Sequence, residues 1–123
     1  MRGALAEELP RFVKPALLRA AALPDGDRWA YQVKWDGCRG QLRWDGRRAV
    51  LRSRPGRDCT AEFPELAAGA ALLGSRRVLL DGEIVSFADD GKPDFDRVRR
   101  RMAAAAGWGW RAPAARAGRA DRL

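Results

Sequence analysis

The 123-residue sequence contains no histidine, and this absence removes a large group of catalytic and metal-binding arrangements. A Ser-His-Asp triad, a Cys-His pair and a histidine-ligated metal site are all excluded. Cysteine is also scarce, because Cys38 and Cys59 are the two in the chain. Two cysteines are too few for a disulfide scaffold or a cysteine-based zinc site, so we expect free thiols in a reducing compartment.

Long apolar runs are missing as well. No apolar segment has the length needed to cross a membrane. The first residues, MRGALAEELPRF, place two glutamates and a proline where a signal peptide would be apolar. We therefore expect a cytoplasmic protein that forms one domain or part of one.

Lysine is rare in a chain that is otherwise rich in cations. The sequence has 24 Lys and Arg residues, of which Lys14, Lys34 and Lys92 are the lysines, and its net charge is +8. The excess is unevenly distributed, because residues 1–96 carry a net charge of +1 and residues 97–123 carry +7. The net charge thus gives no support for nucleic-acid binding by the first part of the chain.

Alternation of apolar and polar side chains predicts an antiparallel meander of three strands, joined by turns at Asp36-Gly37 and Asp45-Gly46. Both central residues of a type I′ turn have positive φ, which favours such dipeptides. The predicted strands span residues 29–35, 39–44 and 48–53. A further β-rich run covers residues 77–87.

Three helices are predicted between and after these strands. Pro15 would open a short helix in residues 11–23. Thr60 would cap a helix that ends at Gly74, and Asp94 would cap a helix that ends at Gly107. The mixture of antiparallel strands and intervening helices indicates an α+β fold.

Lys34 is the first candidate for chemistry. Arginine serves most phosphate-binding roles, but it cannot lose its proton and act as a nucleophile, whereas lysine can. The cations Arg39 and Arg43 follow closely and would lower the pKa of a neighbouring lysine. The alternative is a solvated lysine beside a turn.

Acidic and basic side chains elsewhere add further candidates. Glu83 lies in the run VLLDGEIVSF, where a carboxylate between apolar flanks would bind a cation or a hydroxyl group. The alternative is that Asp81-Gly82-Glu83 forms a hairpin turn. Arginines suited to phosphate contact occur in two groups, although a charged run on a helix is more often a solvated face. They are Arg52, Arg54 and Arg57, and then Arg97, Arg99, Arg100 and Arg101.

Four short blocks, taken together, resemble the covalent nucleotidyltransferase superfamily and most closely the bacterial ATP-dependent DNA ligases. Lys34–Arg39 (KWDGCR) is similar to the family's KxDGxR block. Residues 53–66 resemble the next block, with SRPG followed by Thr60 and FPEL. Residues 81–85 (DGEIV) resemble the DGE block, and residues 90–101 resemble the block in which a Phe opens a helix with an Arg six residues later.

The resemblance implies an antiparallel-sheet nucleotidyltransferase (ATP-grasp-like) fold, present in part, and a mechanism. Lys34 would attack the α-phosphate of ATP and carry AMP, which then passes to a DNA 5′-phosphate before the nick is sealed. The implied partner is nicked double-stranded DNA, and the implied cofactors are ATP and Mg²⁺. The implied roles are catalytic for Lys34 and Asp36, nucleotide-binding for Gln32, Val33, Arg39, Arg54 and Glu83, metal-binding for Glu83, and DNA-binding for Arg54, Arg57 and Arg101.

The chain departs from the family pattern at two places. Gln32 stands where these ligases usually have Glu. After Met102 the family's stacking aromatic, EG block and KxK block do not follow, and the OB-fold domain is also absent. We therefore expect residues 1–102 to be the N-terminal part of an adenylation domain. Residues 103–123, rich in Ala, Arg and Gly, would be a disordered tail from a truncated or frame-shifted reading frame.

Three interpretations remain open at this stage. The first is an ATP-dependent DNA ligase whose isolated 123-residue chain is impaired or inactive. The second is an RNA ligase or capping guanylyltransferase, which the SRPG…T…FPEL block disfavours. The third is a non-catalytic basic fragment that binds nucleic acid through residues 97–123 in a salt-sensitive manner.

Overall fold

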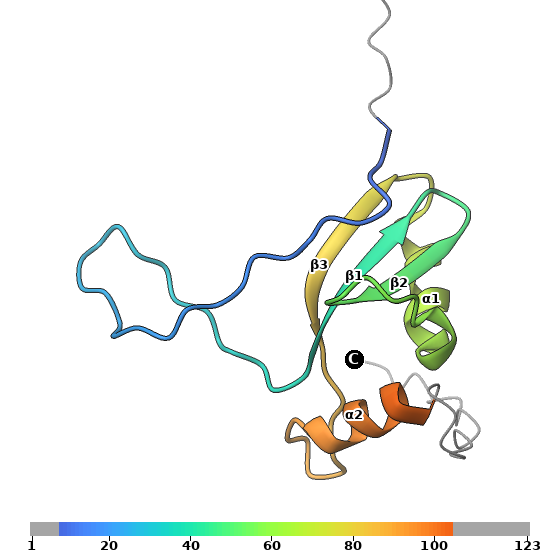
Figure 1. Ribbon diagram of the computed structural model, residues 1–123. Helices are drawn as coiled ribbons and strands as arrows, with labels where there is room; N and C mark the ends of the chain where they lie inside the picture. The colour runs from blue at the N-terminus through green and yellow to red at the C-terminus, as the bar shows by residue number, and fades with distance from the viewer. Residues whose placement is uncertain (1–7, 105–123) are drawn as a thin grey trace, which may run out of the picture.

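The computed structural model describes residues 8–104 and consists of a small antiparallel sheet with short helices (Figure 1). This arrangement confirms the predicted α+β class. The predicted tail lies outside the described residues from position 105 onward, and residues 103 and 104 still belong to the last helix. The elements in chain order are β1 (Cys38–Trp44), β2 (Ala49–Ser53), η1 (Thr60–Glu62), α1 (Pro64–Gly69), η2 (Ala70–Leu73), β3 (Val78–Ile84) and α2 (Phe95–Ala104).

The sheet has the order β2-β1-β3, with β1 antiparallel to both neighbours. The prediction that residues 29–35 form the first strand of the sheet is therefore wrong, because β3 pairs with β1 at that position. Residues 29–35 have the alternation of a strand but no partner strand among the described residues. Without a neighbouring ladder, the pattern alone does not hold a segment in a sheet.

The β1–β2 hairpin forms where Asp45-Gly46 predicts it, through a four-residue loop at residues 45–48. Gly46 has a φ of 94°, and no non-glycine residue in the described part of the chain has positive φ, so the expected two-residue type I′ turn is not formed. The Asp45 carboxylate instead accepts hydrogen bonds from the backbone N–H groups of Arg47 and Arg48 at 2.9 and 2.8 Å. These bonds hold the pKa of Asp45 below its usual value.

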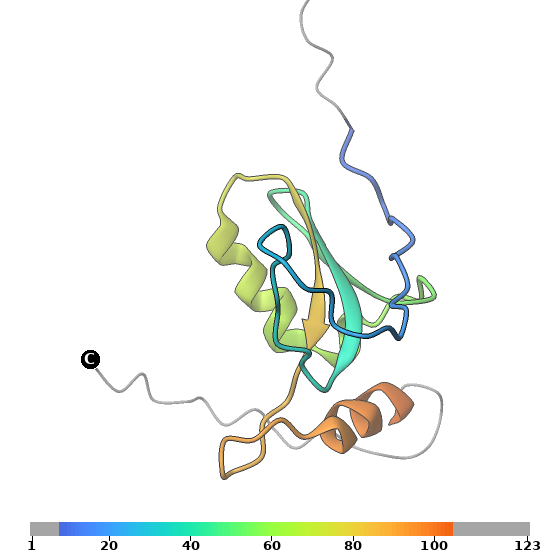
Figure 2. The same ribbon diagram turned by 90° about the vertical axis from the view of Figure 1, so that its left-hand side faces the viewer.

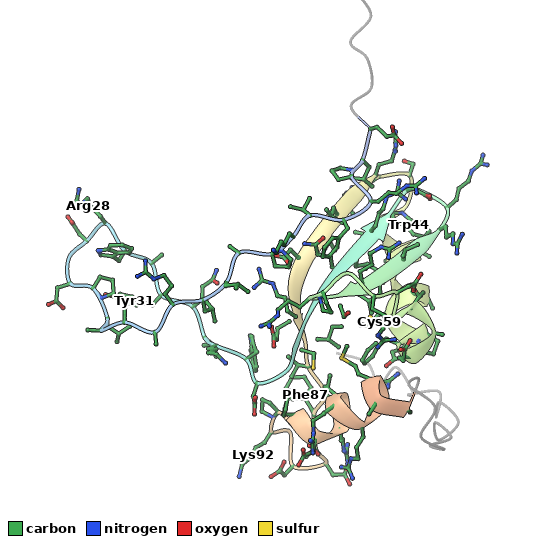
Figure 3. All side chains as sticks on the ribbon, in the orientation of Figure 1. Arg28, Tyr31, Trp44, Cys59, Phe87 and Lys92 are labelled. Atoms are coloured by element: carbon green, nitrogen blue, oxygen red, sulfur yellow. The ribbon has the colours of Figure 1, made fainter. Side chains whose placement is uncertain are left out.

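The core lies on one face of the sheet, beneath the helices. Leu51 and Ile84 from the sheet pack with Cys59, Phe63 and Val98. Figure 3 shows Cys59 between the sheet and α2. Partly buried neighbours complete the cluster: Cys38, Leu42 and Met102.

Of the three predicted helices, one is absent, one is divided into shorter helices and one begins where it was predicted. No helix forms in residues 11–23, where the leucines are largely exposed and an isolated turn gains no packing energy. The second helix is divided into η1, α1 and η2 and ends at Gly74, whose φ is 61°. Thr60 does not cap it, since its hydroxyl oxygen accepts the N–H of Leu51 at 2.9 Å. The third begins as predicted, with the Asp94 carboxylate accepting the N–H of Arg97 at 3.1 Å.

The face of the sheet opposite the core is polar and carries the N-terminal segment. In Figure 2 the sheet lies between α1 on one side and this segment on the other. The side-chain amide of Gln41 accepts the N–H of Val13 at 3.0 Å and donates to the carbonyl oxygen of the same residue. Gln41 is buried as a result, and together with Arg43, which donates to the carbonyl oxygen of Pro10 at 3.2 Å, it holds the N-terminal segment across β1.

None of the helices within residues 8–104 is both long and apolar enough to cross a membrane.

Candidate active site

Gly37 joins the turn that follows Lys34 to the end of β3. A Cβ atom built on Gly37 would lie 2.2 Å from the carbonyl oxygen of Ile84 and 3.1 Å from Cγ of Glu83. No side chain fits at that distance, so the backbone of the turn can approach β3 only because residue 37 is glycine. The Gly of the KxDGxR block thus packs on the backbone of Ile84, the residue that follows the Glu of the DGE block.

Arg39 lies opposite Glu83 in the β1–β3 register and forms an ion pair with Asp81. Its Nε and Nη2 donate to the two carboxylate oxygens at 2.9 and 2.6 Å. The hydrogen bond from Arg39 is the main reason why the pKa of Asp81 is lowered, and the same bond raises the pKa of Arg39. This two-pronged contact fixes the guanidinium over the polar face, where residues 39, 81 and 83 all point because side chains alternate along a strand.

The charges of Asp36 and Glu83 act on the thiol of Cys38. Burial raises the pKa of Cys38 most, and the negative charges of Glu83 and then Asp36 raise it further. The thiol itself packs against the core, whereas Glu83 belongs to the opposite, polar face of the sheet. Both carboxylates are exposed, which corrects the expectation that Glu83 lies in a buried strand.

The segment that carries Lys34 lies away from the sheet. Gln32, Val33 and Lys34 are exposed, and Figure 3 shows Tyr31 on a long excursion of the chain. Trp35 is the attachment point, since its ring meets the Phe87 ring edge-on at 82° with a centroid distance of 6.2 Å. The structure thus positions the residues after Lys34 and leaves the lysine in solvent. Residues 8–104 form no ion pair to Lys34, Arg54 or Glu83.

The three arginines predicted to contact DNA occupy different settings. Arg54 is exposed in the tight turn after β2. Arg57 pairs with Glu62, which raises its pKa. Arg101 donates to the carbonyl oxygen of Glu62 and to both oxygens of Glu65, and its guanidinium lies 4.6 Å from the centre of the Phe63 ring.

These contacts commit most donors of Arg101 to holding α2 against η1 and α1. The lowered pKa of Glu65, caused mainly by the hydrogen bond from Arg101, reports the same pairing. A contact from Arg101 to DNA phosphate stays a prediction, and its Glu65 pair would have to open first.

Asp81 is the site residue that the prediction omitted. The sequence contained a signal for this contact. Residues 81 and 83 share one face of a strand, and Arg39 on the neighbouring strand could reach both of them. The prediction treated Arg39 as a free ligand-binding group. In the structure its guanidinium is oriented by a carboxylate of the same sheet.

A magnesium ion could bind here only with help from a nucleotide. No group of three or more potential ligand residues that could hold a metal is found within the described part of the chain. Mg²⁺, however, is usually held by one or two carboxylates together with substrate phosphates. The exposed carboxylate of Glu83 fits such a shared site.

A family model described as "ATP dependent DNA ligase domain" matches residues 8–109. The multifunctional non-homologous end joining DNA repair protein LigD of Mycobacterium tuberculosis is 45% identical over 74 residues, which cover 60% of this chain and 10% of that protein. LigD of Pseudomonas aeruginosa is 34% identical over 91 residues, or 74% of this chain and 11% of that protein.

A solved structure agrees with these relatives. The crystal structure of the ligase domain from M. tuberculosis LigD aligns with a TM-score of 0.51 and 42% identity over 56% of this chain and 23% of that chain. A mycobacterial DNA ligase D structure complexed with ATP and MES aligns with a TM-score of 0.52 and 43% identity, over 57% of this chain and 23% of that chain.

The sheet and its packed turn therefore have the fold of part of a DNA ligase domain. The chain belongs to the family of ATP-dependent DNA ligase domains, which confirms the resemblance stated from the four sequence blocks. It spans about a tenth of the length of the LigD proteins that it matches.

Proposed function

We propose that this chain forms the first part of the adenylation domain of an ATP-dependent DNA ligase that acts in DNA repair. The observation that supports this most is the contact of Gly37 with β3, because it joins the nucleophile block to the DGE block. Arg39, oriented by Asp81, lies on the same face as Glu83. An oriented cation of this kind is suited to stabilise the charge that develops on phosphoryl oxygens.

The proposed reaction begins at Lys34. Its neutral Nζ attacks the α-phosphorus of ATP, a phosphorus–nitrogen bond forms, the bond to the bridging oxygen breaks, and pyrophosphate leaves while the amine proton passes to solvent. Arg39 and Arg54 stabilise charge on the phosphoryl oxygens. Glu83 and the phosphates would hold Mg²⁺, which would supply neutralisation of part of the same charge.

The later steps use the carried AMP. A DNA 5′-phosphate at a nick attacks the lysyl phosphoramidate, so AMP moves to that phosphate and Lys34 regains its amine. The 3′-hydroxyl then displaces AMP and closes the backbone. We propose that nicked double-stranded DNA is the substrate, with Arg54, Arg57 and Arg101 as the phosphate contacts predicted from sequence.

The 123-residue chain on its own should be a poor enzyme. Lys34 is exposed, and no described residue covers it or excludes water from its surroundings. Exclusion of water strengthens the electrostatic interactions on which phosphoryl transfer depends. A chimera is therefore the sharper test of the chemistry, with residues 29–101 replacing the matching segment of the M. tuberculosis LigD ligase domain.

The chimera is incubated with Mg²⁺ and ATP labelled at the α-phosphate. We expect an acid-labile, base-stable adduct that Lys34→Ala and Lys34→Arg abolish. Lys92→Ala, which changes an exposed lysine in a turn, should leave it intact. A folded chimera that takes no label refutes the proposal, and labelling by GTP in preference to ATP favours the guanylyltransferase interpretation.

A further inference from the structure

The polar face of the sheet holds a concave site, and of its lining residues only Arg52 was considered for phosphate contact from the sequence. It has a volume of about 270 Å³ and lies between the N-terminal segment and the β1–β2 hairpin. We call it the arginine pocket; its lining residues are Glu8, Arg11, Arg43, Val50 and Arg52. Three cations and one carboxylate give this lining a net positive charge.

The sheet register explains why two of these arginines converge. Arg43 pairs with Val50, and Arg52 stands two residues further along β2, opposite Gln41. The two arginines are diagonal neighbours on one face, a separation that long side chains bridge. Both therefore extend from the polar face into the same region.

Several N–H donors of these two guanidinium groups have no acceptor within the described part of the chain. Arg43 donates to the carbonyl oxygen of Pro10 at 3.2 Å and lies 3.4 Å from Asp45. Arg52 donates through Nη1 to the carbonyl oxygen of Gly56 at 2.9 Å. Its Nε is buried with no hydrogen-bond partner within residues 8–104. An unmet buried donor beside other cations is costly unless an anion compensates it.

Nearby carboxylates offset part of the charge of the pocket. One oxygen of Asp45 accepts the N–H groups of the hairpin loop, and its other oxygen lies 3.4 Å from Arg43. Asp58 accepts the N–H and hydroxyl of Thr60 at 3.0 and 2.6 Å; these bonds are the main cause of its lowered pKa, to which the charge of Arg52 adds. Glu8 is the acidic residue of the lining itself.

We propose that the arginine pocket binds a phosphoryl anion, and that this anion is a backbone phosphate of the DNA substrate. The identity of the ligand rests on the proposed function; the presence of an anion site rests on the pocket alone. Arginine suits this role because its planar fork matches two phosphate oxygens. Such contacts position a duplex without reading its sequence.

The test measures binding of the full chain to a fluorescent DNA duplex containing one nick, across a range of salt concentrations. Arg11→Gln is the main variant, because Arg11 is exposed and its loss should leave the fold intact. We expect affinity to fall about threefold, and the slope of log affinity against log salt to decrease by about 0.9. Arg43→Gln should weaken binding about tenfold, and Glu8→Gln should strengthen it.

Arg28→Gln provides the matched control, since it removes the same charge from an exposed residue on the excursion away from the sheet (Figure 3). Residues 105–123 are identical in every variant, so their contribution cancels. Equal losses for Arg11→Gln and Arg28→Gln, or no loss for either, overturn the proposal.

Two further arms separate the sources of phosphate. Titration with ATP and with inorganic pyrophosphate shows whether the pocket binds nucleotide phosphates. If Arg11→Gln and Arg43→Gln weaken the binding of ATP and pyrophosphate but leave duplex binding unchanged, the DNA assignment is overturned. Labelling of Lys34 is scored independently in the chimera. Failure of that labelling alongside arginine-dependent duplex binding would refute the proposed ligase chemistry and leave the anion site standing.

Discussion

Replacement of Gly37 by alanine tests whether the turn after Lys34 depends on close backbone contact with β3. The added Cβ would lie 2.2 Å from a backbone oxygen of Ile84, well inside van der Waals contact, and a backbone atom cannot move aside as a side chain can. Overpacking of this kind costs about 1–3 kcal/mol or more, and we place Gly37→Ala at about 3 kcal/mol. Since 1.4 kcal/mol is about tenfold, the ratio of folded to unfolded protein should fall about a hundredfold.

Two other glycines of the sheet provide graded controls. Gly82→Ala should be neutral, because its Cβ would meet nothing within 4 Å. Gly40→Ala should be intermediate, since its Cβ would lie 2.7 Å from Cδ1 of Ile84, which is a side-chain atom. Ile84→Val removes that Cδ1, so it should partly rescue Gly40→Ala and leave Gly37→Ala unrescued.

Urea unfolding followed by tryptophan fluorescence gives the midpoint of each variant. With a denaturant slope of about 1 kcal/mol/M for a small domain, the expected loss for Gly37→Ala is about 3 M in midpoint. Equal midpoints for Gly37→Ala and Gly82→Ala would show that the turn does not pack on β3. Rescue of Gly37→Ala by Ile84→Val would equally contradict the backbone clash.

Three further predictions concern titration, thiol chemistry and the N-terminal segment. The pKa of Asp81 is lowered in the folded state, so its contribution to stability is complete above the ordinary aspartate pKa of about 3.9 and is lost as the pH falls through the lower folded value. The unfolding free energy of Asp81→Asn, measured by urea titration, should therefore lie below that of wild type by less than about 1 kcal/mol at pH 6, because the pair is partly exposed, and should approach wild type toward pH 2. Burial raises the pKa of Cys59 to about 11, so only about 0.1% of this thiol is ionised at pH 8. A disulfide reagent should therefore modify Cys59 only after the protein unfolds. Rapid labelling of the native protein would contradict the position of Cys59 in the core. Gln41→Ala removes both hydrogen bonds to Val13, so limited proteolysis should cut residues 8–14 several times faster, whereas Gln32→Ala, an exposed control, should not change the rate.

Features that depend on local chemistry could be predicted from the sequence. The Asp45-Gly46 turn and the Asp94 cap are set by residues within a few positions of one another, and both occur where the sequence placed them. The four blocks likewise identified the family that the comparisons show. Their placement relative to one another was less accessible, because β3 pairs with β1 across a sequence separation of about forty residues.

The errors arose where a local pattern needs a distant partner. Residues 29–35 alternate as a strand, yet Trp29, Tyr31 and Val33 are 56%, 62% and 74% exposed, and no described strand lies beside them. Pro15 suggested a helix, but no surface covers the leucines that would have stabilised it. Among the candidate site residues, the pairing of Arg39 with Asp81 depends on strand register, which the prediction of three consecutive strands had assigned differently.

The edge-on contact between Trp35 and Phe87 has a consequence for the chemistry at the preceding residue. Phe87 belongs to the loop that leads from β3 to α2, so one aromatic pair links that loop to the peptide unit next to Lys34. A shift of the loop would reach the lysine through Trp35, the residue next to it. Under the proposed function, substitutions at position 87 should accordingly change the rate of adduct formation at Lys34 in the chimera.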